Sequence, residues 1–176
     1  DGSYFASIGI VAVTINYLNA QGRYHFGLSP DSILVHFDEK PSVPRILLFD
    51  LGMASEKQHL ALEFYPFAVP PAYMAPELVE AQPGQILPDY RTEVYGLGIV
   101  FYELLVGQPA FPFKLRSDNE VLQAVTHGKA VPMNRIEDVR SSAQIALQAC
   151  NLDPTDRQKS AYDLAQQLRS VFRDVP

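Results

Sequence analysis

The chain has 176 residues, of which 47% are hydrophobic, and it carries a formal net charge of −6 at neutral pH. This length and apolar content suit one compact domain with a sizeable core. Acidic residues outnumber basic ones and no basic run is present, which argues against nucleic acid or an anionic membrane as the partner. The single cysteine, Cys150, cannot form an internal disulfide and favours a reducing, cytoplasmic environment.

Residues 1–22 are expected to form a largely buried helix. Apolar residues recur at helical spacing from Phe5 onward, and Gln21-Gly22 should end the helix. The longest apolar stretch, residues 5–15, is too short to span a bilayer. No signal-peptide pattern opens the chain, and Asp1-Gly2 reads as the middle of a longer protein.

Residues 23–52 are predicted to form a β-hairpin that carries two polar loops. Two short apolar runs, residues 33–37 and 46–49, flank a segment rich in charge and proline, which is typical of a hairpin. A polar loop, residues 25–32, precedes the first run, and Asp50-Leu-Gly52 follows the second. A hairpin that holds two such loops side by side is a place where chemistry is expected.

The remainder is predicted to be an irregular segment followed by helices. Residues 53–77 are the irregular segment, rich in proline near its end. Helical spacing of apolar residues over 88–107, closed by Gly107, predicts a second long helix. Within 117–176, a capping box that begins at Ser117 and two further apolar stripes predict three more helices.

Four short motifs resemble those of the C-terminal lobe of eukaryotic-type Ser/Thr protein kinases, and they occur in the order of that family. They are His25-Phe-Gly-Leu-Ser-Pro-Asp-Ser32 for the catalytic loop His-Arg-Asp-Leu-Lys-x-x-Asn, Asp50-Leu-Gly52 for Asp-Phe-Gly, Ala75-Pro-Glu77 for Ala-Pro-Glu, and Asp153-Pro-Thr-Asp-Arg157 for Asp-Pro-x-x-Arg. The resemblance implies a mainly α fold, a protein-kinase-like C-lobe over residues 1–176 with long buried helices and a small β-hairpin. The N-lobe is expected to be absent, because the sequence holds no Gly-x-Gly-x-x-Gly loop and no Val-Ala-x-Lys strand.

The resemblance also assigns a part to each segment and to five structural residues. The segments are the helix before the catalytic loop (1–22), the hairpin with the catalytic-loop and Asp-Leu-Gly loops (23–52), the activation-like segment (53–77), the central helix (88–107) and the C-terminal helices (117–176). His25 should pack under the second loop against Leu51. Glu77 and Arg157 should form a buried ion pair, since neither charge is expected to be buried alone. Glu93 stands where the family has aspartate and should accept hydrogen bonds from the backbone of the first loop.

The positions that perform phosphoryl transfer in the family are degenerate here, so no catalytic residue is expected. Gly27 stands at the catalytic aspartate and has no side chain to accept a proton. Ser29 replaces the phosphate-binding lysine, and Ser32 replaces the metal-binding asparagine. Asp50 keeps an oxygen suited to Mg²⁺, although a turn residue that binds local backbone is the simpler interpretation. Leu34 would form the floor under an adenine only if a nucleotide binds.

The phosphorylation switch of the activation segment is also replaced. Phe26 stands at the arginine that normally pairs with a phosphorylated residue, and Pro70 stands at a threonine of the segment. We expect aromatic packing to take over this role, with Phe26 in contact with Phe64 or Phe67.

Two functions remain open at this point. The first is a catalytically inactive C-lobe, a pseudokinase that acts as a binding, scaffold or regulatory signalling module without a cofactor. The alternative is a fragment of a divergent Ser/Thr kinase that uses ATP and Mg²⁺, with its N-lobe upstream or on another chain and Asp31 as a replacement carboxylate. In either case the apolar face near Leu34 and Leu51, which an N-lobe would cover, is expected to meet a protein partner, a second copy or the missing lobe, or to be covered by local segments.

Overall fold

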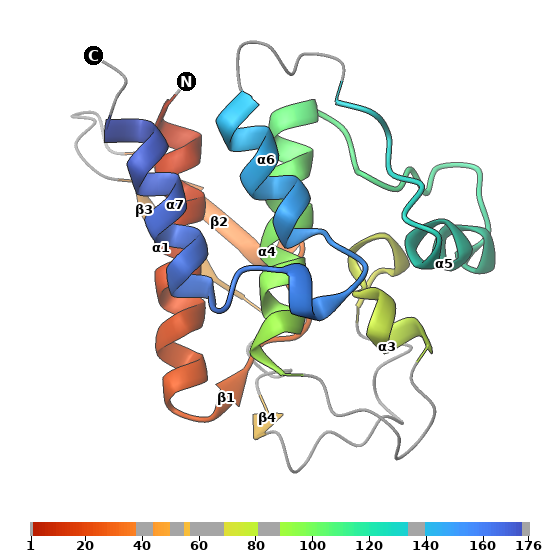
Figure 1. The fold of residues 1–176 in the computed structure, drawn as a ribbon, viewed down its shortest axis with the longest axis horizontal. Coiled ribbons are helices and arrows are strands. Elements are labelled where there is room, and N and C mark those ends of the chain that lie inside the picture. The colour runs from red at the N-terminus through yellow and green to blue at the C-terminus, as the bar shows by residue number, and fades with distance from the viewer. Residues whose placement is uncertain are drawn as a thin grey trace.

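A helix surrounded by other helices forms the centre of the protein (Figure 1). The structure is a computed structural model, and it describes residues 2–37, 44–49, 55–56, 69–80, 89–133 and 140–173. The central helix, α4, spans Tyr90–Val106. The helices packed on one side of it are α1 (Gly2–Ala20), α6 (Arg140–Ala149) and α7 (Ala161–Arg173).

Helix α4 begins and ends where the sequence provides the chemistry for it. The side chain of Asp89 accepts a hydrogen bond from the amide of Arg91 at 2.8 Å and so caps the first turn. Gly107 ends the helix with a φ of 79°, a left-handed conformation that glycine adopts without strain. All residues from Thr92 to Tyr102 are buried, because other elements cover every face of this part of the helix.

A small residue allows α4 and α6 to approach closely. A Cβ atom added at Gly98 would lie 2.5 Å from the Cβ of Ala149. Any side chain at this position therefore forces the two helices apart.

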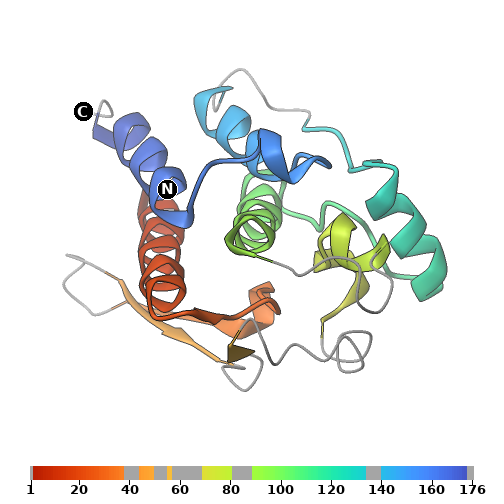
Figure 2. The ribbon, with the colours of Figure 1, turned by 60° about the horizontal axis from the view of Figure 1, so that its bottom comes forward.

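Helix α4 separates two hydrophobic clusters. The first lies among α1, α4, α6 and α7 and includes Ile8, Val11, Ile15, Leu97, Phe101, Leu164 and Leu168. The second joins the other side of α4 to the short elements η5 (Pro71–Tyr73) and α3 (Pro76–Glu80) and to α5 (Asp118–Thr126). Figure 2 shows this division, with α3 and α5 across α4 from the first helix.

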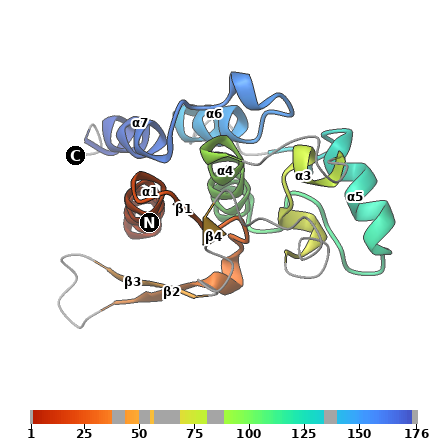
Figure 3. The same ribbon diagram turned by 90° about the horizontal axis from the view of Figure 1, so that it is seen from below.

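Two small antiparallel sheets complete the described part of the chain. Strand β1 (Arg23–Tyr24) pairs with β4 (Ser55–Glu56), and β2 (Ile33–His36) pairs with β3 (Arg45–Leu48). The second pair has the strands expected of the hairpin, whose turn lies outside the described residues. A single turn of 3₁₀ helix, η1 (Pro30–Ser32), leads into β2. In Figure 3 this hairpin lies on the side of α1 that faces away from α7.

The hairpin has one face toward the helices and one toward solvent, as strand alternation requires. Ile33, Ile46 and Leu48 pack against the first hydrophobic cluster. Leu34 lies opposite Leu47 on the outer face, and both are exposed.

The C-terminal elements start at side-chain caps. In α5 the hydroxyl of Ser117 accepts from the amide of Glu120, and the carboxylate of Glu120 accepts from the amide of Ser117 at 2.8 Å. The 3₁₀ turn η6 (Pro154–Asp156) precedes α7, and the hydroxyl of Ser160 accepts from the amide of Asp163 at 3.0 Å. Among the described residues, no helix combines the length and apolar character that crossing a membrane demands.

Candidate functional site

The loop of residues 25–32, between β1 and β2, is folded into the protein. His25, Phe26, Gly27, Leu28 and Ser29 are buried in succession, and Ser32 is 0% exposed. Only Asp31 of this loop is exposed. The positions expected to face a substrate or a metal ion are therefore packed against the protein instead.

The two serines of the loop bind each other. The hydroxyl of Ser32 accepts a hydrogen bond from the amide of Ser29 at 3.0 Å and donates one to the carbonyl of Ser29 at 2.8 Å. The backbone amide of Ser32 donates to the same carbonyl at 3.1 Å. This closed turn engages the Ser32 hydroxyl as both donor and acceptor, so it offers a cation a weaker ligand than an unengaged oxygen.

His25 holds this loop to the end of β3. Its Nε2 atom lies 2.8 Å from the carbonyl oxygen of Phe49, and the amide of Gly27 donates to its Nδ1 atom at 3.3 Å. Because Nδ1 accepts, Nε2 carries the ring hydrogen, and the buried imidazole is neutral. Leu51, the expected neighbour of this ring, lies outside the described residues, so that contact stays a prediction.

Glu93 connects the first turn of α4 to the same loop. Its Oε1 atom accepts a hydrogen bond from the backbone amide of His25, which is the bond anticipated for this residue. The side chain is 1% exposed. Burial raises the pKa of Glu93 to about 7, and hydrogen bonding with the backbone of His25 and Phe26 and with the Asn19 side chain opposes the rise.

Phe26 is buried, and among the described residues the ring of Tyr24 stacks on it. The two ring centroids are 5.0 Å apart and the planes differ by 5°. Phe26 also belongs to the second hydrophobic cluster, with Val69 and Tyr73 of the segment before α3. The proposed contact with Phe64 or Phe67 falls outside the described residues. Phe26 thus shares a buried cluster with part of this segment, and its contact with Phe64 or Phe67 stays a prediction.

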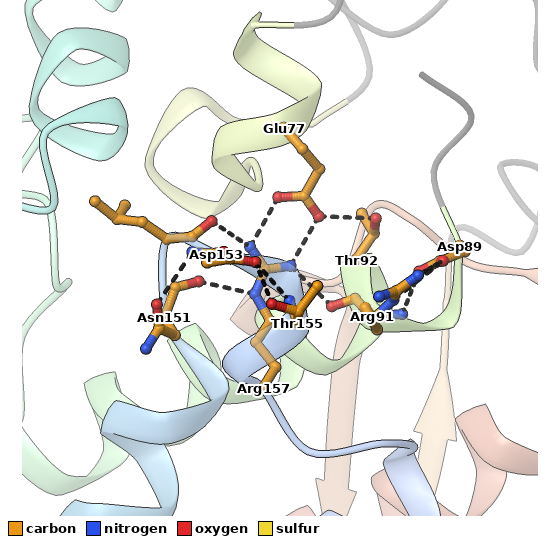
Figure 4. A network of polar contacts seen from close by, with 9 residues as sticks. Glu77, Asp89, Arg91, Thr92, Asn151, Asp153, Thr155 and Arg157 are labelled. Atoms are coloured by element: carbon orange, nitrogen blue, oxygen red, sulfur yellow. Dashed lines mark hydrogen bonds and ion pairs between the residues drawn. The ribbon is translucent and has the colours of Figure 1, made fainter.

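Glu77 and Arg157 form the ion pair anticipated from the sequence (Figure 4). Two guanidinium nitrogens of Arg157 donate to the two carboxylate oxygens of Glu77, each at 2.8 Å. The hydroxyl of Thr92, on α4, donates to the same carboxylate at 2.9 Å. The pair joins α3 to the turn before α7, and both rest on α4.

The remaining hydrogens of the guanidinium point at backbone carbonyls. Arg157 donates to the carbonyl oxygens of Asn151 at 2.8 Å, Arg91 at 3.0 Å and Leu152 at 3.3 Å. Its central carbon lies 4.8 Å from the centre of the Tyr95 ring. A guanidinium has five N–H groups, and here each has an acceptor, so the charge is fully compensated although it is buried.

The outer face of the hairpin is apolar and open. Leu34 is 50% exposed and Leu47, opposite it, is 56% exposed. Phe49, which follows β3, is 47% exposed. Beside the hairpin, a cavity of about 200 Å³ between α1, β2 and α4 is lined mainly by apolar side chains such as Val11, Val35 and Val100.

The described residues include no group of three side chains that would suit a metal ion. Asp50, the residue with the best oxygen for Mg²⁺, lies outside the described part of the chain. Of the other positions considered for a nucleotide or its metal, Leu34 is accessible, Ser32 is enclosed and Gly27 has no side chain. The described loop therefore has no charged side chain at positions 27, 29 and 32.

Several structural residues of this site have no signal in the sequence. Asn19 and Tyr24 lie outside every motif, yet one contacts Glu93 and the other stacks on Phe26. Thr92 is adjacent to Glu93 in a helix, and nothing in the sequence connects it with Glu77.

The structure has the features of a protein kinase domain. It is mainly helical with a small hairpin, His25 and Glu93 hold a buried loop, and Arg157 holds the Ala-Pro-Glu segment. Residues 6–170 match the family model described as "Protein kinase domain". The chain therefore belongs to the protein kinase family.

Three curated relatives that resemble this chain are kinases by name. It is 31% identical over 125 residues to "Serine/threonine-protein kinase ULK3" of Homo sapiens, covering 70% of this chain and 24% of the relative. It is 32% identical over 112 residues to "Death-associated protein kinase 2" of Homo sapiens, covering 64% of this chain and 28% of the relative. It shares 30% identity over 115 residues with "Calcium-dependent protein kinase 3" of Plasmodium yoelii yoelii, covering 65% of this chain and 20% of the relative. The matched part thus spans between 20% and 28% of each of these relatives.

Proposed function

We propose that this chain is the C-terminal lobe of a protein kinase that has lost phosphoryl transfer and acts as a binding or scaffold module in signalling. The observation that carries the proposal is the closed loop of residues 25–32. Gly27 supplies no carboxylate, and the hydroxyl of Ser32 is engaged by the backbone of Ser29.

The physical argument rests on what phosphoryl transfer needs. The reaction depends on positioning the nucleophile and on compensating charge around the transferred phosphoryl group. A buried glycine and two uncharged, mutually bonded serines at the three working positions provide neither. The proposal is also supported by the contacts of residues that hold the fold: His25 with Phe49, Glu93 with the amide of His25, and Glu77 with Arg157.

Nucleotide binding gives a direct test. A ligand present at a hundredfold excess over its Kd stabilises the folded state by about 2.7 kcal/mol, which is easily seen as a rise in Tm. We expect ATP with Mg²⁺ to leave the Tm of this chain unchanged, as Mg²⁺ alone should. A saturable rise that disappears in Asp50→Asn would contradict the proposal and favour the alternative.

The alternative is a fragment of a divergent Ser/Thr kinase that needs ATP, Mg²⁺ and an N-lobe from upstream or from another chain. It is supported by the relatives, all three of which carry kinase in their names. Asp31 is the exposed carboxylate of the loop that would have to replace the missing base. Phosphate transfer to a peptide after addition of an N-lobe, abolished by Asp31→Asn and retained in Glu80→Gln, would establish it.

The binding role is assigned to the outer face of the hairpin. Exposed Leu34, Leu47 and Phe49 form an apolar surface that a protein partner or a second copy would cover. Self-association is tested by sedimentation of the chain and of Leu47→Lys. We expect the unmodified chain to sediment as a species heavier than a monomer or to bind an N-lobe. We expect Leu47→Lys to do neither. A cytoplasmic location remains part of this proposal.

A further inference from the structure

Two buried oxygen atoms near the loop of residues 25–32 lack a hydrogen-bond partner among the described residues. One is Oε2 of Glu93 and the other is Oδ1 of Asn19. Glu93 lies in the first turn of α4 and Asn19 in the last turn of α1. An oxygen buried without a donor is costly, and two that are neighbours call for a common explanation.

The other atoms of both side chains are already engaged. Oε1 of Glu93 accepts from the amide of His25, and Nδ2 of Asn19 donates to the carbonyl oxygen of Arg23 at 3.1 Å. Asn19 is close enough to influence the carboxyl group of Glu93 directly. The bond to Arg23 fixes the orientation of the amide, because a flipped amide would place two oxygens against each other.

Among the described residues, the groups that act on the Glu93 carboxyl are the backbone of His25 and Phe26 and the side chain of Asn19, and none of them is a cation. The His25 ring is neutral, because its Nδ1 accepts from Gly27. The titratable and charged groups on the neighbouring elements are Tyr24 on β1, Asp89 paired with Arg91 at the start of α4, and Arg157 paired with Glu77. A carboxylate at this place would therefore be buried without a compensating positive charge.

We propose that Glu93 binds a proton from solvent at neutral pH and donates it from Oε2 to Oδ1 of Asn19. This single proton pairs both unpartnered oxygens and joins the end of α1 to the start of α4. The loop that begins at His25 is held between them. When the proton leaves, two oxygens with lone pairs face each other beside the loop, and its attachment is weakened.

The direction of the pH dependence follows from burial. Burial raises the pKa of Glu93 from 4.5 to about 7. When the pH lies between these two pKa values, the folded chain binds a proton that the unfolded chain does not. The contribution of Glu93 to the free energy of unfolding is therefore complete below the lower pKa. It is lost as the pH rises through the higher one.

The test is urea denaturation from about pH 5 to about pH 8, at constant ionic strength. We expect the folding equilibrium constant of the unmodified chain to fall on the order of 50-fold over this range because of Glu93. Glu93→Gln should remove this dependence, because an amide at position 93 can accept from His25 and donate to Asn19 at every pH. The matched control, Glu80→Gln on the surface of α3, should keep it. A pH dependence in Glu93→Gln equal to that of the unmodified chain would overturn the proposal.

Asn19→Ala separates the two possible directions of the hydrogen bond. If Asn19 accepts the proton, its removal shifts the transition to lower pH. If its amide instead donates to a charged Glu93, the removal shifts the transition to higher pH, and the proposal is wrong.

Should Glu93→Gln fail to fold, infrared spectroscopy of the unmodified chain with isotope-labelled glutamate decides the matter. We expect the carbonyl band of a protonated carboxylic acid at neutral pH, and we expect this band to disappear when the pH is raised. Absence of the band at neutral pH would overturn the proposal.

Discussion

Replacing Arg157 by lysine should destabilise the protein although it keeps the charge. The guanidinium donates five hydrogen bonds, two to Glu77 and the others to backbone carbonyls. An ammonium group has three N–H groups, so at least two buried acceptors lose their donor. Each lost bond to a charged donor costs about 1.5–3 kcal/mol, and some lost bonds are regained through relaxation, so we expect a loss of about 2–4 kcal/mol.

The assay is urea denaturation followed by circular dichroism, with the slope m compared between variants so that changes in the unfolded state are recognised. The matched control is Arg91→Lys, the same substitution in the surface pair with Asp89, where the arginine side chain is 35% exposed. An exposed pair contributes about 0–1 kcal/mol. The reasoning fails if Arg157→Lys costs no more than Arg91→Lys.

A second variant separates the charge from the hydrogen bonds. Glu77→Gln leaves the guanidinium buried without a carboxylate, which should cost about 3–5 kcal/mol. Replacing both residues, as Glu77→Leu with Arg157→Met, should cost less than the two single changes added together, because neither charge is then left alone.

Other substitutions test separate parts of the fold. Gly98→Ala should destabilise by about 1–3 kcal/mol in thermal unfolding, because its Cβ would meet Ala149 at 2.5 Å. Gly9→Ala, in α1 with no atom within 4 Å of its Cβ, should instead stabilise by about 0.5–1 kcal/mol, and equal effects at both sites would contradict the close approach of α4 and α6. Ser32→Ala should cost about 1–3 kcal/mol because the buried amide of Ser29 loses its acceptor, and an unchanged urea midpoint would show that the turn does not depend on this hydroxyl.

The sequence predicted well those features that depend on residue type and spacing. The end of the long helix at Gly107, the two strands within residues 33–37 and 45–49 and the pair of Glu77 with Arg157 all follow from local chemistry or from a motif. Each of these residues has few alternative partners, because caps and buried charges restrict what can satisfy them.

The parts of the site that were missed depend on side-chain direction. The hydroxyl of Ser32 turns back to Ser29, and the ring of Phe26 stacks on Tyr24. Both arrangements depend on torsion angles that residue identity does not determine. Phe26 has a φ of 53°, an unusual value for a residue with a side chain, and its ring stacks on Tyr24 of β1. The closeness of Asn19 to Glu93 likewise arises only when α1 packs on α4.

The pairing of α1 with α7 has a consequence for synthesis of the chain. These helices lie side by side, as Figures 1 and 3 show, but about 140 residues separate the end of one from the start of the other. During translation at about 5–20 residues per second, α7 is therefore synthesised on the order of ten seconds after α1. The apolar side of α1 lacks its packing partner during this time. A chaperone that binds apolar segments is expected to occupy α1 in this interval, and ribosome-bound chains that stop before α7 should be captured more strongly than chains that include α7.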